Sequence, residues 1–404
     1  MIENANGDMA RNALRVIAVA QRRLDILPDG MESGVLEREL TFLGLFGLMD
    51  PPREGAEEAV SRCAKAGIRT VLITGDHKLT AVAVARQLGI LRPGLQAVTG
   101  SELDFMSTEM LEEEVERFAV YARVTPEHKL RIVKAWQKKG KIVAMSGDGV
   151  NDAPALKRAD IGCAMGRSGT DVAKGAAHMI LTDDDFSTIV HAVEEGRGIY
   201  ANIRKAIHYL LSCNIGEIVT ILVATMLDLS QMPLVPVQLL WLNLVTDSLP
   251  ALALGVEPVE EGVMERPPRA GDAPLFDRKF TLRLLWQGMM VGGLTLTAYF
   301  LGLRTGEACA NTMAFATLTL SQLFHAFNVR SEDTSLFRQG VLSNPAMNRA
   351  FLIGLGLQLA VLLLPPLQQV FCVVPLSPLR WLGVLALAMA PIPICEAVKR
   401  NGRT

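Results

Sequence analysis

The sequence predicts an α/β domain with a parallel sheet, followed by an all-α bundle of six transmembrane helices. Between residues 50 and 185, short apolar runs alternate with stretches of helical periodicity, as in a parallel sheet with crossover helices. From residue 207 onward there are six apolar segments, each near the roughly 20 residues that cross a bilayer as a helix. A third observation is the turn after the apolar run 142–144, which holds two glycines and two carboxylates in Gly147-Asp148-Gly149-Val150-Asn151-Asp152.

The composition agrees with a chain that is partly embedded in a membrane. With 404 residues, half of them hydrophobic, the chain is too long for one ordinary domain and too apolar for an average soluble protein. The 40 basic residues are balanced by 42 acidic ones, so the charge excess of a nucleic-acid-binding protein is missing. The first residues do not have the basic and apolar regions of a signal peptide, and we expect membrane insertion through internal segments.

The six cysteines lie far apart, without a C-x-x-C pair or the histidine spacing of a zinc site. A disulfide scaffold and a zinc finger are therefore excluded. Cys309 and Cys372 fall in segments that we place on the outer side of the membrane, where a disulfide is conceivable, but two unrelated free thiols are the favoured interpretation.

Residues 1–49 predict two strands, 14–20 and 40–48, with a polar connection between them. Two strands do not make a domain, so we expect them to be the end of a domain whose beginning lies outside this sequence. The run Asp50-Pro51-Pro52-Arg53 predicts a rigid hinge, because each proline fixes its own φ and restricts the residue before it.

The elements expected next are helix 54–66, strand 68–73, helix 80–88, helix 125–139, and strands 141–144, 161–166 and 179–181. Thr74 lies at the carboxyl end of the strand 68–73, where parallel sheets bind ligands. The helix 125–139 has a capped start with proline at its first position, in Thr125-Pro126-Glu127-His128-Lys129. The acidic triplet 183–185 is interpreted as a solvated helix start, and the charged helix 186–206 that follows as a stalk leading to the membrane.

The six expected transmembrane helices span residues 207–227, 234–256, 282–303, 310–329, 349–371 and 379–398, with a tail at 399–404. Basic residues gather before the first helix, after the second, after the fourth and after the sixth, whereas the alternate loops hold only Arg304 and Arg380. By the positive-inside rule, the basic loops, the α/β domain and the C-terminus face the cytoplasm. We expect an integral, multi-pass membrane protein in the plasma membrane of a prokaryote.

Polar residues inside the first two membrane segments predict a cation site. Asn214 and Glu217 are three residues apart and share a helix face. Pro250, which breaks the helix ladder and frees backbone carbonyls, follows a second polar set in the next segment: Asn243, Thr246 and Asp247. Two intramembrane acids with amide and hydroxyl oxygens suit a hard cation. The less favoured alternative is that these groups only join helices by hydrogen bonds.

The stretch from Ala144 to Pro154, Ala-Met-Ser-Gly-Asp-Gly-Val-Asn-Asp-Ala-Pro, resembles the hinge motif of P-type ATPases, cation pumps built on a haloacid-dehalogenase-like domain. The stretches 213–217 and 241–251 resemble the fifth and sixth transmembrane helices of calcium-transporting P-type ATPases. Gly216 supports this subtype, because sodium/potassium pumps have proline in the equivalent place. The resemblance covers nearly the whole chain and implies the C-terminal portion of a calcium-type pump. The fold class is then a haloacid-dehalogenase-like (Rossmann-type) phosphorylation domain at 50–185, preceded by a remnant of the nucleotide-binding domain and followed by the transmembrane bundle.

The resemblance also implies roles for individual residues. Thr74 would donate a hydrogen bond to a phosphoryl group, and Lys129 would neutralise its charge. Asp148 and Asp152 would hold Mg²⁺, with Asp152 also catalytic and Asn151 near the transferred phosphate. Further contacts to nucleotide or phosphate would come from Arg15, Gly75, Asp76 and Arg123. Each residue taken singly has an ordinary alternative as a helix cap or a solvated side chain, and only the combination is specific.

The implied ligands of the transported cation are Asn214, Glu217, Asn243, Thr246, Asp247 and Gln322. Gln322 departs from the sarcoplasmic-reticulum type, which has an acid there. This departure leaves open how many ions bind and whether the ion is Ca²⁺, Mn²⁺ or another cation.

The family's nucleophile, an aspartate in Asp-Lys-Thr-Gly-Thr, does not occur in this sequence, and neither do the actuator domain and the first four membrane helices. We therefore expect a P-type ATPase that uses Mg-ATP and an aspartyl phosphate formed outside this chain, so that the chain alone is inactive. A start inside a domain suggests a truncated or split coding sequence. The expected partners are ATP, a divalent cation, the lipid bilayer and a separate chain carrying the N-terminal half, but no nucleic acid.

Two alternatives remain. One is a non-catalytic membrane module that keeps the pump fold for binding or regulation. The other is a membrane-tethered phosphatase, which would require a further nucleophilic aspartate near Thr74 and Lys129, and no predicted strand offers one.

Overall fold

The computed structural model describes residues 2–11, 14–24, 36–49, 52–229, 231–271 and 273–401. The chain divides into two compact units. The α/β unit comprises Met1–Glu194 and Glu261–Ala273, and the helical unit comprises Glu195–Glu260 and Pro274–Thr404. The predicted combination of a parallel α/β fold with an all-α part is confirmed.

The α/β unit begins with α1 (Ile2–Arg11) and an antiparallel pair of strands, β1 (Leu14–Gln21) and β2 (Thr41–Met49). Both predicted strands are confirmed, whereas α1 has no counterpart in the sequence prediction. Most of the polar connection between the strands lies outside the described residues, and so do Asp50 and Pro51 of the predicted hinge.

Two three-stranded sheets follow, and all of their strands are parallel. One has the order β3-β5-β4 and the other β6-β7-β8, so β3 and β6 each pair on one side only among the described strands. The strands are β3 (Leu72–Ile73), β4 (Gln96–Thr99), β5 (Phe118–Ala122), β6 (Ala144–Gly147), β7 (Ile161–Met165) and β8 (Met179–Leu181). The crossover helices are α3 (Ala56–Lys65), α4 (Lys78–Gln87), α5 (Gly100–Asp104), α6 (Thr108–Glu114), α7 (Pro126–Lys138), α8 (Ala153–Arg158) and α9 (Asp171–Ala176).

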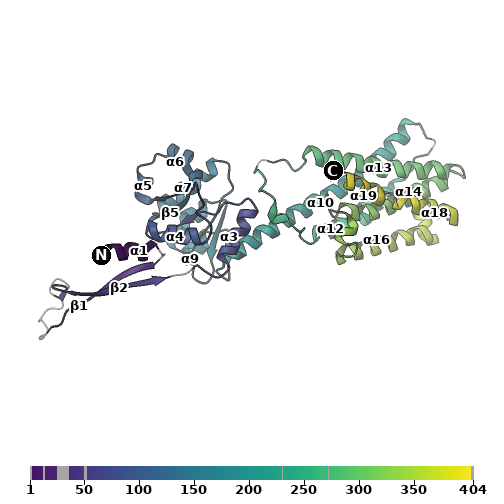
Figure 1. Cartoon of the computed structure of the whole chain (residues 1–404). Coiled ribbons are helices and arrows are strands. Elements are labelled where there is room, and N and C mark those ends of the chain that lie inside the picture. Colours follow the sequence, from purple (N-terminus) through teal and green to yellow (C-terminus); the bar gives the residue numbers. More distant parts are fainter. Residues whose placement is uncertain are drawn as a thin grey trace. The chain divides into compact units, whose positions relative to one another are not determined.

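The fully buried β5 lies at the centre of the first sheet. Its residues pack against α4 in one apolar cluster and against α7 in another, and Figure 1 shows these helices on either side of the strand. The sequence prediction did not include β4 and β5, because an apolar run of five residues has no distinctive period. The strand expected at 68–73 forms a ladder only at Leu72 and Ile73.

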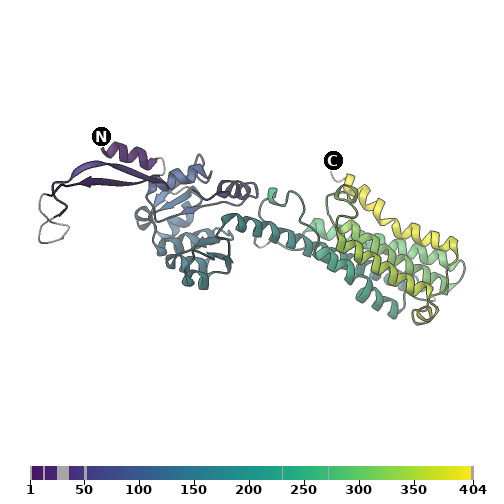
Figure 2. The same ribbon diagram turned by 90° about the horizontal axis from the view of Figure 1, so that it is seen from below.

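The helical unit contains the longest helix, α10 (Phe186–Met226), which begins in the α/β unit and continues without a break, as expected for the segment after residue 185. Figure 2 shows the helices of this unit running side by side. They are α11 (Pro236–Trp241), the π-helical segment η3 (Leu242–Thr246), α12 (Ser248–Gly255), α13 (Arg278–Leu303), α14 (Glu307–Val329), α15 (Leu336–Gln339), α16 (Pro345–Leu363), α17 (Pro365–Val370), α18 (Pro378–Met389) and α19 (Pro391–Asn401).

Five helices in the described part of the chain are long and apolar enough to cross a membrane, which does not confirm the expected count of six. They are Phe186–Met226, Pro236–Gly255, Arg278–Leu303, Pro345–Leu363 and Pro378–Arg400. The expected helix 310–329 is present within α14, but its many Thr, Ser, Asn and Gln residues reduce its hydropathy. From Cys309 to Val329 every residue except Phe324 is buried, so α14 has no face that needs to be apolar towards lipid.

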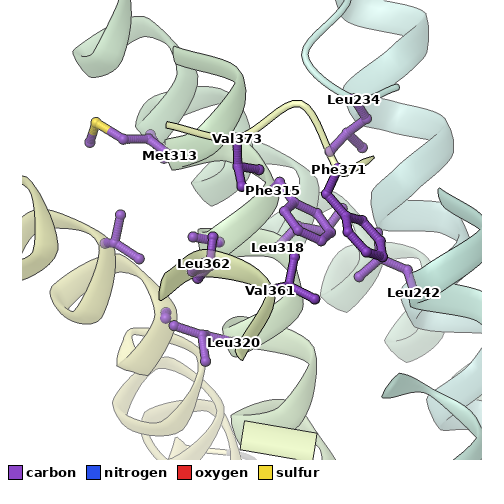
Figure 3. Close-up of a cluster of buried hydrophobic side chains, with 14 of the residues drawn as sticks. Leu234, Leu242, Met313, Phe315, Leu318, Leu320, Val361, Leu362, Phe371 and Val373 are labelled. Atoms are coloured by element: carbon purple, nitrogen blue, oxygen red, sulfur yellow. The ribbon is translucent and has the colours of Figure 1, made fainter. Parts of the chain in front are cut away.

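The apolar core of the helical unit is built around α14, which packs against α13, α16, α18 and α19. Figure 3 shows Phe315 of α14 beside Phe371, and their rings stack with centroids 6.2 Å apart. All six cysteines are free in this structure, and Cys309 is buried whereas Cys372 is exposed.

Candidate functional site

Thr74 follows β3 directly and forms a tight turn with Asp76. The Thr74 hydroxyl donates to Asp76 Oδ2 at 3.0 Å, and the Asp76 N–H donates to Thr74 Oγ1 at 3.1 Å. The backbone N–H of Arg123, after the neighbouring strand β5, donates to the Asp76 carbonyl at 3.1 Å. Arg123 has a φ of 51°, in the left-handed region that non-glycine residues seldom adopt. The structure thus brings three of the predicted residues together at the carboxyl ends of two parallel strands.

The start of α7 is fixed by a reciprocal cap. Thr125 Oγ1 accepts from the His128 N–H at 3.4 Å, and His128 Nδ1 accepts from the Thr125 N–H at 3.2 Å. On its other side, His128 Nε2 lies 2.7 Å from Asp104 Oδ1. Together with Pro126 at the first helical position, these contacts hold the turn that carries Lys129.

Lys129 and Asp152 form an ion pair with 2.5 Å between Nζ and Oδ1. The other carboxylate oxygen of Asp152 accepts from the Gly149 N–H at 3.1 Å, so both oxygens are held in place. Gly147 lies directly against this carboxylate, and a Cβ at position 147 would be 2.6 Å from Asp152 Cβ. The sequence Gly-Asp-Gly therefore allows the backbone to pass close to a carboxylate that is nearly buried.

Asp148 and Asn151 lie in the same turn but are exposed. Asp148 lines a cavity of about 340 Å³ together with Ser146 and Gly147, and its backbone carbonyl accepts from the Thr170 N–H at 2.9 Å. The apolar cluster that contains Met145 also includes Ile73 of β3, so the ends of β3 and β6 share a core.

Asp184 also lines this cavity, and the interpretation of its triplet as a solvated helix start is wrong for this residue. Its carboxylate is buried and accepts from the backbone N–H groups of Arg167 and Ser168, both at 2.8 Å. These hydrogen bonds, the one from Arg167 first, hold the pKa of Asp184 well below its ordinary value. Arg53, the last residue of the predicted hinge, donates to the Asp184 carbonyl.

The carboxylates of this turn fit a magnesium ion. Within the described residues no three His, Cys, Asp or Glu side chains gather as a metal cluster. Mg²⁺ is usually held by one or two carboxylates together with waters and substrate phosphates, and the carboxylates of Asp148 and Asp152 are ligands of this kind. Arg15 lies on β1 opposite Leu48, and its side chain is outside the described part of the chain, so its role stays a prediction.

In the helical unit, Glu217 of α10 is buried and accepts hydrogen bonds from two other elements. The side-chain amide of Asn243 donates to Oε2 at 3.0 Å, and that of Gln322 donates to Oε1 at 3.3 Å. The carbonyl oxygen of Gln322 is buried and has no hydrogen bond among the described residues. The predicted association of the first, second and fourth membrane segments through these three residues is therefore present.

Asp247 follows the π-helical segment η3, where the chain between α11 and α12 is wound more loosely. The Tyr209 hydroxyl donates to Asp247 Oδ1 at 3.3 Å, while Oδ2 has no hydrogen bond among the described residues. π-Helical turns are often found at functional sites, and this one contains Asn243 and ends just before Asp247. An acid that is 1% exposed with an unpaired oxygen is the kind of group that a cation would satisfy.

Asn214 and Thr246 hydrogen-bond the backbone of their own helices. Asn214 Nδ2 donates to the Leu210 carbonyl at 2.8 Å and Thr246 Oγ1 to the Leu242 carbonyl at 3.0 Å. Neither bond joins two helices. The alternative interpretation, in which the polar side chains only link helices by hydrogen bonds, therefore does not explain Asn214 and Thr246.

Gly216 lets α10 and α13 approach each other closely. A Cβ at position 216 would be 3.1 Å from Val291 Cγ1, and one at Gly292 would be 2.9 Å from the Gly216 carbonyl. Small residues at such crossings are typical of helices in membranes.

Two functional candidates escaped the sequence prediction. One is Tyr209, which donates to Asp247. It is eight residues before Glu217, a spacing that puts both on one helix face, so the helical periodicity could have predicted it. The buried pair of Glu257 and Arg330 had no such signal, because the two residues lie outside the apolar segments and 73 positions apart.

Three family models together match most of the chain. Residues 11–160 match the haloacid dehalogenase-like hydrolases, and a second model of this description matches residues 129–193. Residues 231–401 match the model described as the C-terminus of cation transporting ATPases.

Curated relatives match over nearly the whole chain. Calcium-transporting ATPase 1 of Bacillus cereus is 46% identical over 97% of this chain and 46% of the relative. Calcium-transporting ATPase of Bacillus subtilis is 47% identical over 95% of this chain and 43% of the relative. Calcium-transporting ATPase type 2C member 1 of Bos taurus is 40% identical over 100% of this chain and 41% of the relative. The chain thus spans less than half of the length of these relatives, and it belongs to the P-type cation-transporting ATPases, whose C-terminal part it matches.

Proposed function

We propose that this chain is the C-terminal part of an ATP-driven calcium transporter. The observation that carries the proposal is the group of Glu217, Asp247, Asn243 and Gln322. It places two buried acids and the Asn243 amide within helices long and apolar enough to span a membrane, and adds the Gln322 amide from the buried helix α14. The group supplies oxygen ligands, as Ca²⁺ requires, and the curated relatives are named calcium-transporting. A pump for Mn²⁺ remains the second candidate, because Mn²⁺ accepts similar ligands.

The α/β unit supplies the machinery for phosphoryl transfer. Asp148 and Asp152 would hold Mg²⁺, which neutralises phosphate charge when it is bound. Lys129 pairs with Asp152 and would present a positive charge to a phosphoryl group. The Thr74 hydroxyl, which donates to Asp76 in this structure, would donate to the same group from the neighbouring sheet. Arg15, Gly75, Asp76, Arg123 and Asn151 complete the proposed contacts to ATP.

The phosphate acceptor would be an aspartate outside this chain. Thr74 follows β3 and Asp148 follows β6, and each of these strands is an edge strand of its own sheet among the described residues. A parallel strand supplied by the missing part of the pump would therefore carry its aspartate between the two residues that act on the phosphate. We propose that α10 transmits the reaction, because this one helix starts beside Asp184 and carries Asn214 and Glu217.

The proposed location is a plasma membrane of a prokaryote, with the α/β unit and the C-terminus in the cytoplasm. This orientation follows from the basic residues on α10 before residue 207, between α12 and α13, between α14 and α16, and at the end of α19.

Equilibrium binding of radioactive Ca²⁺ to the purified chain in lipid nanodiscs tests the cation site. Glu217→Gln and Asp247→Asn each remove a carboxylate, and we expect at least a tenfold loss of affinity. Glu396→Gln is a matched control, because Glu396 is an acid of the same unit that bonds Ser335. Unchanged Ca²⁺ binding in both site variants would refute the proposal. Adding Mn²⁺ as a competitor compares the affinity of the site for Mn²⁺ with its affinity for Ca²⁺ and so tests the second candidate.

Labelled ATP tests the phosphoryl site. We expect no acid-stable phosphoenzyme from the chain alone, but one that forms when the N-terminal half of the Bacillus cereus relative is added. Lys129→Ala should abolish it, whereas Lys138→Ala, an exposed lysine near the end of the same helix, should not. A phosphoenzyme in the isolated chain would overturn the assignment of the acceptor to another segment.

A further inference from the structure

One thiol lies on the face of α10 that points to the acids of the proposed cation site. Cys213 is four residues after Tyr209 and four before Glu217, and this spacing puts the three side chains on one face of the helix. Cys213 is 0% exposed and packs with Tyr209 in one buried cluster. Along α10 it therefore lies between Glu217 and the tyrosine that binds the other acid, Asp247.

A chain of hydrogen bonds connects this thiol to Asp247. The Tyr209 hydroxyl has one proton, which it donates to Asp247 Oδ1 at 3.3 Å. The Cys213 thiol forms a hydrogen-bonding contact with the same hydroxyl. Since the proton of the phenol is already used, the thiol is the donor in this contact and the phenol oxygen is the acceptor. The sulfur is therefore one hydroxyl group away from the carboxylate of Asp247.

Two oxygens of the same site have no hydrogen bond among the described residues. They are Oδ2 of Asp247, whose side chain is 1% exposed, and Oε1 of Gln322, whose side chain is 0% exposed. Buried polar atoms are nearly always paired. A carboxylate or amide oxygen can only accept a hydrogen bond or bind a cation, so the two oxygens indicate a bound cation next to the thiol's hydrogen-bonded partner.

A buried cysteine is most often only a small apolar side chain. Cys309 of α14 fits that description, because it packs in the apolar cluster around Phe315. Cys213 differs, since its thiol bonds a hydroxyl that itself binds an acid, and the charges of Asp247 and Glu217 both act on the sulfur. Sulfur is a soft ligand, whereas every other ligand of the proposed site is a hard oxygen. Cys213 would therefore change which cations the site prefers.

We propose that Cys213 is a further ligand of the cation site and that its sulfur lets the site bind soft divalent cations such as Cd²⁺. Cd²⁺ has nearly the radius of Ca²⁺ and accepts both carboxylate oxygen and thiolate sulfur. On binding, the S–H bond breaks, the proton passes to water, and the electron pair of the sulfur binds the metal.

The described residues hold no ready cluster of three His, Cys, Asp or Glu side chains, so the sulfur and Asp247 Oδ2 would share the ion with amide oxygens and water. The inference rests on the proposed function, because it adds a ligand to the cation site proposed above.

Competition between Cd²⁺ and radioactive Ca²⁺ on the whole chain in lipid nanodiscs tests the role of the sulfur. We expect Cd²⁺ to displace Ca²⁺, and Cys213→Ser to weaken Cd²⁺ binding at least tenfold while the Ca²⁺ affinity changes less than threefold. Serine keeps the size of the side chain and replaces sulfur by oxygen, so retained Ca²⁺ binding shows that the variant is folded. Cys309→Ser, in the apolar cluster of α14, is the matched control and should leave both affinities unchanged.

Cadmium-113 NMR identifies the ligand atom, because a sulfur ligand shifts the resonance far downfield of the region of oxygen ligands. We expect one downfield signal at stoichiometric Cd²⁺, and this signal should disappear in Cys213→Ser. It should remain in Cys372→Ser, which removes the exposed thiol of the helical unit. A Cd²⁺ affinity that ignores Cys213→Ser, an equal loss of Ca²⁺ and Cd²⁺ affinity, or a cadmium signal confined to the oxygen region would each overturn the proposal.

The two proposals fail separately. Loss of Ca²⁺ affinity in Glu217→Gln, combined with Cd²⁺ binding that ignores Cys213→Ser, would remove only the sulfur ligand. A downfield cadmium signal that depends on Cys213, combined with Ca²⁺ binding that ignores both Glu217→Gln and Asp247→Asn, would remove only the proposed calcium site and leave Cys213 as a ligand of soft metals.

Discussion

Arg330 and Glu257 form a salt bridge that is shielded from solvent on both sides, with 2.8 Å between Nη2 and Oε1 and side chains that are 0% and 1% exposed. The remaining Arg330 donors reach the carbonyls of Gly340 and Val341 and the hydroxyl of Ser343. The pair therefore ties the residue after α14 to the segment after α12 and to the turn before α16.

Removing one partner of this pair should destabilise the helical unit strongly. Glu257→Ala leaves the Arg330 charge buried without compensation, and we expect a loss of about 3–5 kcal/mol in unfolding free energy. Thermal unfolding of the chain in nanodiscs measures the effect. Glu261→Gln, which changes an exposed acid four residues away, should stay within about 0.5 kcal/mol. Equal stability of the two variants would contradict the prediction.

Gly147→Ala should disturb the Asp152 carboxylate. The new Cβ would be 2.6 Å from Asp152 Cβ and Cγ, so the side chain must move away from Lys129. We expect a destabilisation of about 1–3 kcal/mol, the usual cost of overpacking. Gly175→Ala in α9 is the control, because nothing lies within 4 Å of its added Cβ. Chemical denaturation followed by circular dichroism compares the two, and the order of stability must be Gly175→Ala above Gly147→Ala.

Thr125→Ala should weaken the start of α7 without touching Lys129. The substitution removes the hydroxyl that accepts from the His128 N–H, and loss of such a cap costs about 1 kcal/mol. Thr125→Ser keeps the oxygen and should restore most of the stability. Identical stability of the alanine and serine variants would mean that the cap does not hold the helix.

Asp184 should contribute to stability in a pH-dependent way. Its pKa is held low in the folded protein by the N–H groups of Arg167 and Ser168, so the contribution is complete above the unfolded pKa of about 4 and is lost as the pH falls towards the folded value. In Asp184→Asn, the unfolding temperature should therefore fall less steeply between about pH 5 and pH 2 than in the unmodified chain. Glu113→Gln, at an exposed acid, should leave the slope unchanged.

The sequence predicted the class of the fold because this depends on local patterns. The turn around Asp148 and the spacing of Asn214 and Glu217 are likewise set by a few neighbouring residues, and the structure pairs Asp152 with Lys129 and joins Asn243 to Glu217, while the metal and cation roles of these residues stay predictions. Strand β5 was missed because its five apolar residues have no period.

Long-range relationships were beyond the sequence. The pairing of Glu257 with Arg330, the hydrogen bond from Tyr209 to Asp247, and the burial of Asp184 depend on where distant segments meet. The number of apolar membrane helices also depends on long-range packing. Other helices surround α14, so its side chains do not have to be apolar towards lipid, and its hydropathy is too low for a membrane span.

The burial of α14 bears on how the protein is made. A helix with so many Thr, Asn and Gln side chains partitions poorly into lipid when it leaves the ribosome alone. Its partner α13 precedes it by a three-residue connection and packs along it. We infer that the two helices enter the bilayer as a hairpin and that α14 reaches its central position only after α16 and α18 have closed around it. On this inference, the bundle folds correctly only if α13 is synthesised before α14, and α16 and α18 after it.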